Sequence, residues 1–428
     1  MNESKILTDR QTDRQTDRQT DRQTDRQTDR QTDRRDNTID CMKAICIILM
    51  VACHGGLGLP YSKFIYFFHM PVFFMISGYV YKEYYSENFL SFLMYVKNKA
   101  IRLWIPYVVA TSVCVVLNNF FISINVYTNH PQFLEMVSKE GNRLTDPIQL
   151  WDVFVRITKT FSMNQSTQLS GSLWFIKILF FLSVFYSFND LVVLTLLKKW
   201  NIKNAKQIKL VVQGVIGVIL LLIGYKYSKY FGIDNENQIK VSSYYILYYM
   251  GIILKQYRCV LFQLNNTIKN GICIVCFIGL CWMTITSRIE KFELARNCYN
   301  NPFCLLMASI FGWFFLYYFS LILGKISLVI KPLFYVGKHT LSVLVLHLLC
   351  FKIISCIGLI LDNRPLFLMA AHPVLYYDGY WWIAYTAVGL LIPLTLSSAF
   401  SRIKRVLVEL IKKKRLEYRL MKKDIQSR

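Results

Sequence analysis

Ten apolar runs, separated by short polar or charged stretches, occupy most of the chain after its first 37 residues. They cover residues 38–58, 64–81, 103–124, 173–195, 209–225, 241–255, 270–287, 303–323, 339–361 and 380–400. Most of them are long enough to cross about 30 Å of hydrocarbon at 1.5 Å per residue. The run 241–255 is the weakest, because it is short and rich in tyrosine. The pattern predicts an all-α, polytopic membrane protein with about ten transmembrane helices.

A polar repeat precedes these runs. The unit Thr-Asp-Arg-Gln occurs six times between Thr8 and Gln31 and contains no apolar position. We therefore expect residues 1–35 to form a disordered, solvated leader. A DNA tract of repeated ACAG encodes this residue cycle in all three forward frames, and gain or loss of one unit shifts the frame of everything downstream. We interpret the tract as a phase-variation switch; an inert leader or a misassigned start codon is the alternative.

Composition and charge agree with a membrane protein. The chain is 54% hydrophobic, with a mean hydropathy of +0.33 and a formal net charge of +24. Basic residues concentrate in alternate connections and in the end segment 401–428, so the positive-inside rule places both termini in the cytoplasm. We expect a multi-pass protein of the bacterial inner membrane with a basic cytoplasmic tail. The basic residues are spread over one membrane face, which argues against nucleic-acid binding. The connections assigned to the cytoplasm are 82–102, 196–208, 256–269 and 324–338.

Two basic residues fall within the first apolar run. Lys43 and His54 are eleven residues apart, which is close to three helical turns, so they share one face at an axial separation of roughly 16 Å. Ionisable groups inside a bilayer are costly and usually mark function. The alternative is that Lys43 extends to the interface beside Asp40 and that His54 simply ends the helix before Gly55.

The second apolar run strengthens the interpretation that Lys43 and His54 are functional residues. FIYFFHMPVFFMISGYVYKEYY (64–85) contains His69, Pro71 and Ser77 within an aromatic segment. Lys43, ten residues and then His54, followed by FHMPVFFMISGY, resembles the integral-membrane acyltransferase-3 family, in the branch similar to fucose 4-O-acetylases. That family has Arg or Lys, ten residues and His in its first span, and a phenylalanine-rich segment ending in Ser-Gly-Phe/Tyr in its second.

Three weaker motifs follow in the family's order. KAIRLWIPY (99–107), GSLWFIKILF (171–180) and VGKHTLSVLVLHLL (336–349) resemble its basic stretch, its Trp-Phe segment and its late His-containing span. The resemblance gives a membrane acyltransferase domain over about 36–400. The departures are mild: Lys43 replaces the commoner Arg, and Cys41 follows Asp40 where Gly is usual.

The resemblance implies O-acylation of a cell-surface carbohydrate such as lipopolysaccharide, capsule or exopolysaccharide, or of a lipid-linked glycan, with an acyl-CoA, most simply acetyl-CoA, as donor. A sugar hydroxyl is a poor nucleophile and needs a general base, for which His54 is the best-placed candidate. Lys43, with Lys99 and Arg102 at the same membrane face, suits the phosphates of CoA. An extended pantetheine arm would then reach from Lys43 to His54, and we favour an acceptor cleft that faces the periplasm.

Three further candidate site residues can each be interpreted in two ways. His69 either helps to form the substrate site or belongs to an interfacial aromatic belt, and Trp174 either stacks on a sugar or marks the interface. His347 is either a buried hydrogen-bonded residue or a catalytic one. We expect His339 to be structural and His130 and His372 to be solvated in outer segments. No metal-ligand cluster, Gly-rich phosphate loop or Ser-His-Asp arrangement stands out.

The main rival function is a transporter or flippase for a glycan precursor, since ten spans with buried charges also suit that role. The Lys43–His54 spacing and the FHMP…SGY segment favour the acyltransferase, and no inverted internal repeat is visible in the sequence.

Overall fold

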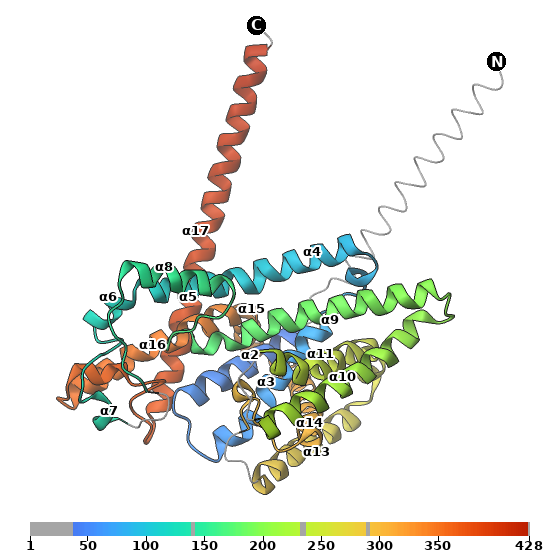
Figure 1. The fold of residues 1–428 in the computed structure, drawn as a ribbon, viewed down its shortest axis with the longest axis horizontal. Helices are drawn as coiled ribbons and strands as arrows, with labels where there is room; N and C mark the ends of the chain where they lie inside the picture. Colours follow the sequence, from blue (N-terminus) through green and yellow to red (C-terminus); the bar gives the residue numbers. More distant parts are fainter. Residues whose placement is uncertain (1–36, 138–141, 232–236, 288–291, 427–428) are drawn as a thin grey trace.

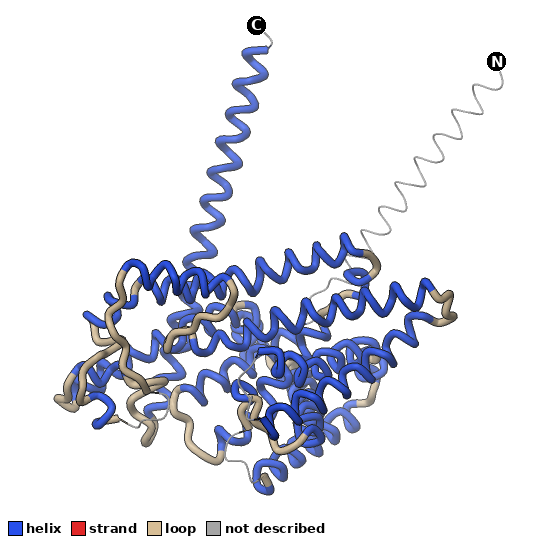
Figure 2. Tube along the Cα trace, viewed as in Figure 1, coloured by secondary structure: helices blue, strands red, loops and turns tan. Residues whose placement is uncertain are grey.

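Helices make up the fold of the described residues. The computed structural model describes residues 37–137, 142–231, 237–287 and 292–426, so the polar leader 1–35 lies outside the described part. Figure 2 shows helices joined by loops, and the only extended pairing within these ranges is a single bridge between Glu293 and Cys298. The predicted all-α class is confirmed.

The longer helices follow one another through the chain in the order seen in Figure 1. They are α2 (Asn37–His54), α3 (Tyr61–Tyr79), α4 (Phe89–Lys99), α5 (Ile105–Val116), α8 (Leu150–Phe161), α9 (Trp174–Lys199), α10 (Ala205–Phe231), α11 (Asn237–Gln256), α13 (Asn266–Thr286), α14 (Pro302–Leu323), α15 (Ser327–Lys338), α16 (Thr340–Leu361) and α17 (Trp381–Gln426). Shorter helices are α6 (Asn118–Ser123), α7 (Phe133–Met136), α12 (Arg258–Gln263), η1 (Glu83–Ser86), η2 (Ala100–Trp104), η3 (Gly171–Leu173), η4 (Leu294–Arg296) and η5 (Leu366–Ala370).

Eight segments within the described residues are long and apolar enough to cross a membrane, which confirms a multi-pass membrane protein. All ten predicted runs fold into helices, and the two that fall short of the apolar criterion are α3 and α11. These two helices pack extensively against each other in the bundle, and both contain many buried residues. A helix that is shielded from lipid by its neighbours tolerates the tyrosines and polar groups found here.

Small residues bring α3 and α11 close together. A Cβ atom on Gly78 would lie 1.8 Å from the carbonyl oxygen of Tyr248, and one on Gly251 would lie 1.9 Å from that of Met75. Both positions therefore require glycine, as is common where membrane helices approach closely. This contact fixes the helix on which His69 lies.

Helix α2 lies inside the bundle and packs against α3, α14, α15, α16 and α17. Its contact with α15 is again close, because a Cβ on Gly337 would lie 2.0 Å from the carbonyl oxygen of Asp40. The helix ends at His54, where Gly56 adopts a φ of +95° and the Leu57 N–H bonds the carbonyl of Ala52. His54 is thus presented at the end of a buried helix rather than along its side.

The third predicted span begins earlier than the sequence suggested. We expected 82–102 to be an inner loop and 103–124 to be the span, but a helical segment starts at Phe89 and continues through the π-helical turn η2 to Val116. The side chain of Asn88 accepts a bond from the Ser91 N–H and so caps this start. Lys99 and Arg102 consequently lie on a helix and not in a loop.

A buried ion pair joins α9 to α10. The Lys209 ammonium lies 3.1 Å from Oδ2 of Asp190, and both side chains are almost fully buried. The hydroxyl of Tyr81 and the amide of Gln213 also donate to this carboxylate. These donors satisfy a charge that would otherwise be too costly inside the membrane region.

Candidate active site

A histidine pair lies where the end of α2 meets the middle of α16. Nδ1 of His54 is 3.0 Å from Nε2 of His347, and the two rings stack with centroids 5.2 Å apart. His347 is fully buried, whereas His54 is partly exposed to a cavity. Of the two readings of His347, the structure shows the hydrogen-bonded one, with His54 as its partner.

Backbone contacts determine the proton positions in this pair. Nδ1 of His347 lies 3.0 Å from the carbonyl oxygen of Val343 and 3.1 Å from that of Leu344. Carbonyl oxygens only accept, so this nitrogen carries a hydrogen, and Nε2 of a neutral His347 is an acceptor. His54 therefore donates from Nδ1, and its Nε2 keeps a lone pair. In the neutral pair, the remaining nitrogen of His54 is a base.

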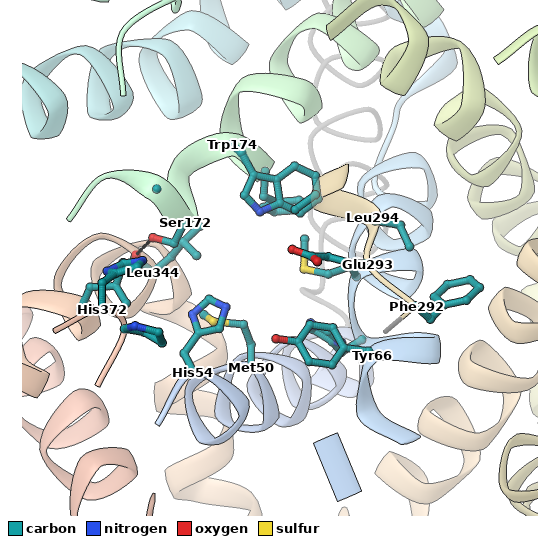
Figure 3. A pocket seen from close by; sticks show the side chains of 17 residues that line it. Met50, His54, Tyr66, Ser172, Trp174, Phe292, Glu293, Leu294, Leu344 and His372 are labelled. Atoms are coloured by element: carbon teal, nitrogen blue, oxygen red, sulfur yellow. Dashed lines mark hydrogen bonds between the residues drawn. The ribbon is translucent and has the colours of Figure 1, made fainter. Parts of the chain in front are cut away.

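A cavity of about 330 Å³ adjoins His54 (Figure 3). His69 and Trp174 line the same cavity, so three of the predicted site residues come together although they lie on α2, α3 and α9. Figure 3 shows the labelled side chains of Trp174, Tyr66 and Glu293 arranged around one space with His54. The polar residues of the lining are His54, Tyr66, His69, Ser172, Trp174, Glu293 and His372.

His69 is buried and faces the cavity from α3. Its Nδ1 donates to the carbonyl of Ile65 at 2.8 Å, so Nε2 of the neutral ring is an acceptor. The ring makes an edge contact with Tyr66, with centroids 5.3 Å apart. The site reading of His69 therefore fits the structure better than a position in an interfacial belt.

Glu293 is a cavity residue that sequence reasoning missed. It precedes η4, its backbone pairs with Cys298, and its Oε2 lies 3.8 Å from Nε of Arg296. The carboxylate is half-buried and enters the cavity from a connection that we had assigned to the outer side. A single acidic residue in a loop gave no periodic signal that would have marked it.

His372 and His130 are not solvated, and that prediction is wrong. His372 lines the cavity, and its backbone N–H donates to Oδ1 of Asn142 at 2.7 Å. Burial, together with the nearby positive charge of Lys352, lowers the pKa of His372 to about 3. His130 stacks on Phe367 with ring centroids 4.0 Å apart. The two outer segments fold onto each other and onto the cavity, which the sequence pattern did not indicate.

A second cavity of about 170 Å³ lies farther along α2, toward its first turn. Lys43 and Arg102 both line it, and Lys43 pairs with Asp40 at 3.2 Å. Lys99 lines neither cavity; its ammonium lies 5.3 Å from the centre of the Tyr95 ring. The structure thus separates Lys99 from the other two predicted cofactor residues.

The two cavities share one wall. Met50 of α2, Met70 of α3, Phe175 of α9 and Leu344 of α16 line both of them. The cationic cavity and the histidine cavity are therefore neighbours along α2, separated by flexible and apolar side chains. Their functional groups, Lys43 and His54, lie roughly 16 Å apart along the helix axis.

His339 lies away from both cavities, at the junction of α15 and α16. Its Nδ1 lies 2.7 Å from the hydroxyl of Ser397 on α17. This contact ties three helices together, which agrees with the structural role expected from the sequence.

A protein-family model described as an acyltransferase domain matches residues 36–402. The match covers most of the chain and includes every residue of the two cavities. It does not distinguish the fucose 4-O-acetylase-like branch. No curated protein and no solved structure matches the chain.

Proposed function

The chain belongs to the acyltransferase-3 family and is a membrane acyltransferase, and we propose that it moves an acetyl group from acetyl-CoA to a hydroxyl of a cell-surface carbohydrate. One observation supports this chemistry above the others: the contact with His347 leaves Nε2 of His54 as a base at the cavity. A hydroxyl nucleophile needs such a base when it attacks a thioester.

The reaction balances with His54 as the only proton carrier. The sugar hydroxyl gives its proton to Nε2 of His54 while its oxygen attacks the thioester carbonyl carbon. The tetrahedral intermediate then collapses, the carbon–sulfur bond breaks, and the departing thiolate takes the proton from Nε2. Throughout, Nδ1–H of His54 donates to the neutral His347, which orients the ring and fixes its tautomer, as the third member of a catalytic triad does, without supplying a negative charge.

The pair of cavities supports the donor's path. Lys43 and Arg102 would hold the phosphates of CoA, since both side chains line the smaller cavity. The pantetheine arm would pass the shared wall at Met50 and Met70 and place the thioester beside His54. Lys99 would contribute only to the local positive potential, because it lines neither cavity.

The acceptor would occupy the larger cavity. Trp174 and Tyr66 offer aromatic faces for a sugar ring, and the carboxylate of Glu293 accepts hydrogen bonds from sugar hydroxyls. His69 has an acceptor nitrogen at the same space. We propose an oligosaccharide or lipid-linked glycan as the acceptor that reaches this cavity.

The distribution of basic residues supports an inner-membrane orientation with both termini in the cytoplasm. In that orientation the cavity at Lys43 opens toward cytoplasmic acyl-CoA, and the cavity at His54 lies toward the periplasmic side. The donor and the acceptor would then approach from opposite faces of the membrane.

Mass spectrometry of the surface glycan tests the function. A strain lacking the gene should lose an acetyl increment on the glycan, and expression of the intact gene should restore it, whereas His54→Ala should not. Unchanged glycan mass together with impaired glycan export would support the transporter instead. A membrane-yield measurement for His54→Ala controls for loss of the protein itself.

The repeat supports a second, genetic proposal. Slippage in an ACAG tract would switch production of everything after Arg34 on and off. Sequencing the locus in single colonies should reveal differing repeat numbers that correlate with glycan acetylation. A stable tract, or one built from mixed synonymous codons, contradicts the proposal.

A further inference from the structure

A groove of about 590 Å³ lies between α10 and α14, away from both site cavities. Helix α10 packs against α11, and α14 packs against α3, but α10 and α14 hardly touch each other. The space between them is therefore left open over a floor of Met75 and Met250. No residue of this groove lines either cavity of the candidate active site.

The groove has an apolar body and a polar end. At one end its polar residues are Gln207 near the beginning of α10, Gln256 at the end of α11 and Tyr257 directly after it; Tyr249 of α11 also lines the groove. The beginning of α10 and the end of α11 lie at the same end of the groove, so the polar groups mark one mouth of the groove. The apolar lining residues are Met75, Leu210, Val211, Met250, Ile253, Leu254, Ile310 and Phe314. A hydrocarbon chain suits this body, and a polar headgroup suits the mouth.

Trp313 gives an independent sign of a ligand. It lines the groove, its side chain is only 1% exposed, and its Nε1 has no hydrogen-bond partner within the described residues. A buried donor without a partner is destabilising, so native structures rarely leave one unsatisfied. The ring packs against Tyr79, the last residue of α3, which places Trp313 at the level of a helix end. An ester carbonyl of a bound lipid would supply the missing acceptor.

Charge around the mouth selects the headgroup. Three exposed basic residues are close in sequence to the polar residues Gln207 and Tyr257. They are Lys203, Lys206 and Arg258. The connections 196–208 and 256–269, which meet at this mouth, contain no acidic residue. Basic pockets between membrane helices bind anionic lipid headgroups. The groove thus combines an apolar slot, an unsatisfied donor and a rim rich in basic residues.

We propose that this groove binds an anionic glycerophospholipid, with an acyl chain between α10 and α14, an ester carbonyl at Trp313 and the phosphate at Lys206 and Arg258. The lipid fills the gap between α10 and α14, which otherwise make few contacts with each other. It is a structural ligand of the helix bundle, distinct from the acyl donor and the acceptor.

Thermal unfolding of the purified full-length protein tests the proposal. Phosphatidylglycerol should raise the unfolding temperature more than phosphatidylcholine with the same acyl chains. The variant Lys206→Gln/Arg258→Gln and the variant Trp313→Phe should each lose most of that difference. Lys226→Gln, which removes an exposed charge from the other half of α10, should keep it. Native mass spectrometry on the same samples should show retained phosphatidylglycerol on the wild type and on Lys226→Gln only.

Equal stabilisation by the two lipids would overturn the proposal, and so would an unchanged phosphatidylglycerol effect in Lys206→Gln/Arg258→Gln. Copurification of a polyprenyl phosphate without phosphatidylglycerol would overturn the choice of lipid. Trp313→Phe removes the donor but also puts a smaller ring at a buried position, so its result is read together with that of Lys206→Gln/Arg258→Gln, which leaves the packing around Trp313 unchanged.

Discussion

His54 and His347 form a hydrogen-bonded pair of 3.0 Å although 293 residues separate them in the chain. His347 has both nitrogens engaged, since its Nδ1 donates to backbone carbonyls of its own helix. It therefore holds the ring of His54 in one tautomer and stabilises the proton that His54 would accept. In the proposed mechanism His54 would be the catalytic residue and His347 a positioning residue.

Substitution of His54 should remove the base. For His54→Ala we expect kcat for acetyl transfer to fall by about 10²–10⁴-fold, the usual contribution of a general base. His347→Leu should lower kcat as well, because the tautomer of His54 is no longer fixed. His347→Gln should recover part of the rate, since its amide oxygen can accept from Nδ1 of His54. The measurement is acetyl transfer from radiolabelled acetyl-CoA in membranes.

Comparison of these variants shows whether a loss of activity comes from a misplaced His54 ring or from a destabilised protein. If His347→Gln and His347→Leu lose activity equally while unfolding at the wild-type temperature, the hydrogen bond to His54 is not important for catalysis. Full activity of His54→Ala would contradict the mechanism itself.

The sequence predicted the helices and the first half of the site because both depend on local patterns. Long apolar runs determine which segments span, and a Lys and a His eleven residues apart must share a helix face. The partners of His54 could not be predicted in this way. His347 looked like any buried histidine, and Glu293 and His372 come from connections whose folding depends on contacts distant in sequence.

The start of the third span shows a second limit. Lys99 and Arg102 suggested a loop because charged residues are unfavourable in hydrocarbon, yet they lie on a continuous helix with a π turn. A helix satisfies its own backbone groups wherever it runs, so charge alone does not end it. The packing of α4 and η2 against α9, and of α5 against α8, shows where this segment lies.

Lys43 should act on the phosphate end of the donor. Loss of a charge-assisted hydrogen bond costs about 1.5–3 kcal/mol, so Lys43→Ala should raise KM for acetyl-CoA roughly 10–100-fold with a smaller change in kcat. Lys43→Arg should behave nearly as wild type, because guanidinium also binds phosphate. The deciding measurement uses acetyl-pantetheine, which lacks the nucleotide phosphates. With that donor Lys43→Ala and wild type should be equally active; a defect that persists would place Lys43 elsewhere in the reaction.

Met50 should limit the size of the transferred group, because it stands in the wall between the two cavities. In Met50→Ala the cavities merge beside the thioester. One methylene in an apolar pocket is worth about 1–3 kcal/mol, so we expect the ratio of kcat/KM for butyryl-CoA to that for acetyl-CoA to rise at least ~10-fold. Met94→Ala, on an exposed face of α4, is the control and should leave the ratio unchanged. An unchanged ratio in Met50→Ala would mean that the acyl group does not pass this wall.

Trp174 should recognise the acceptor by its ring face. Trp174→Ala should raise KM for the carbohydrate, and Trp174→Phe should restore part of the affinity, while KM for acetyl-CoA stays the same in both. Trp151 is an exposed tryptophan of α8 outside the cavity, and Trp151→Ala should change neither constant. Equal effects of Trp174→Ala and Trp174→Phe would point to the indole N–H rather than to stacking.

His372 should make the fold sensitive to acid. Burial and the positive charge of Lys352 lower its pKa from the ordinary value of about 6.5 to about 3 in the folded protein. Between these two values the unfolded chain binds a proton that the folded chain does not, so stability falls as the pH drops from about 6.5 toward about 3. This loss is at most about 1.4 kcal/mol per pH unit. In His372→Gln the loss is absent, and the unfolding temperature, followed by tryptophan fluorescence, should decline less steeply over that window. A variant that is merely less stable would shift the whole curve and keep the wild-type slope, which would contradict a buried neutral His372.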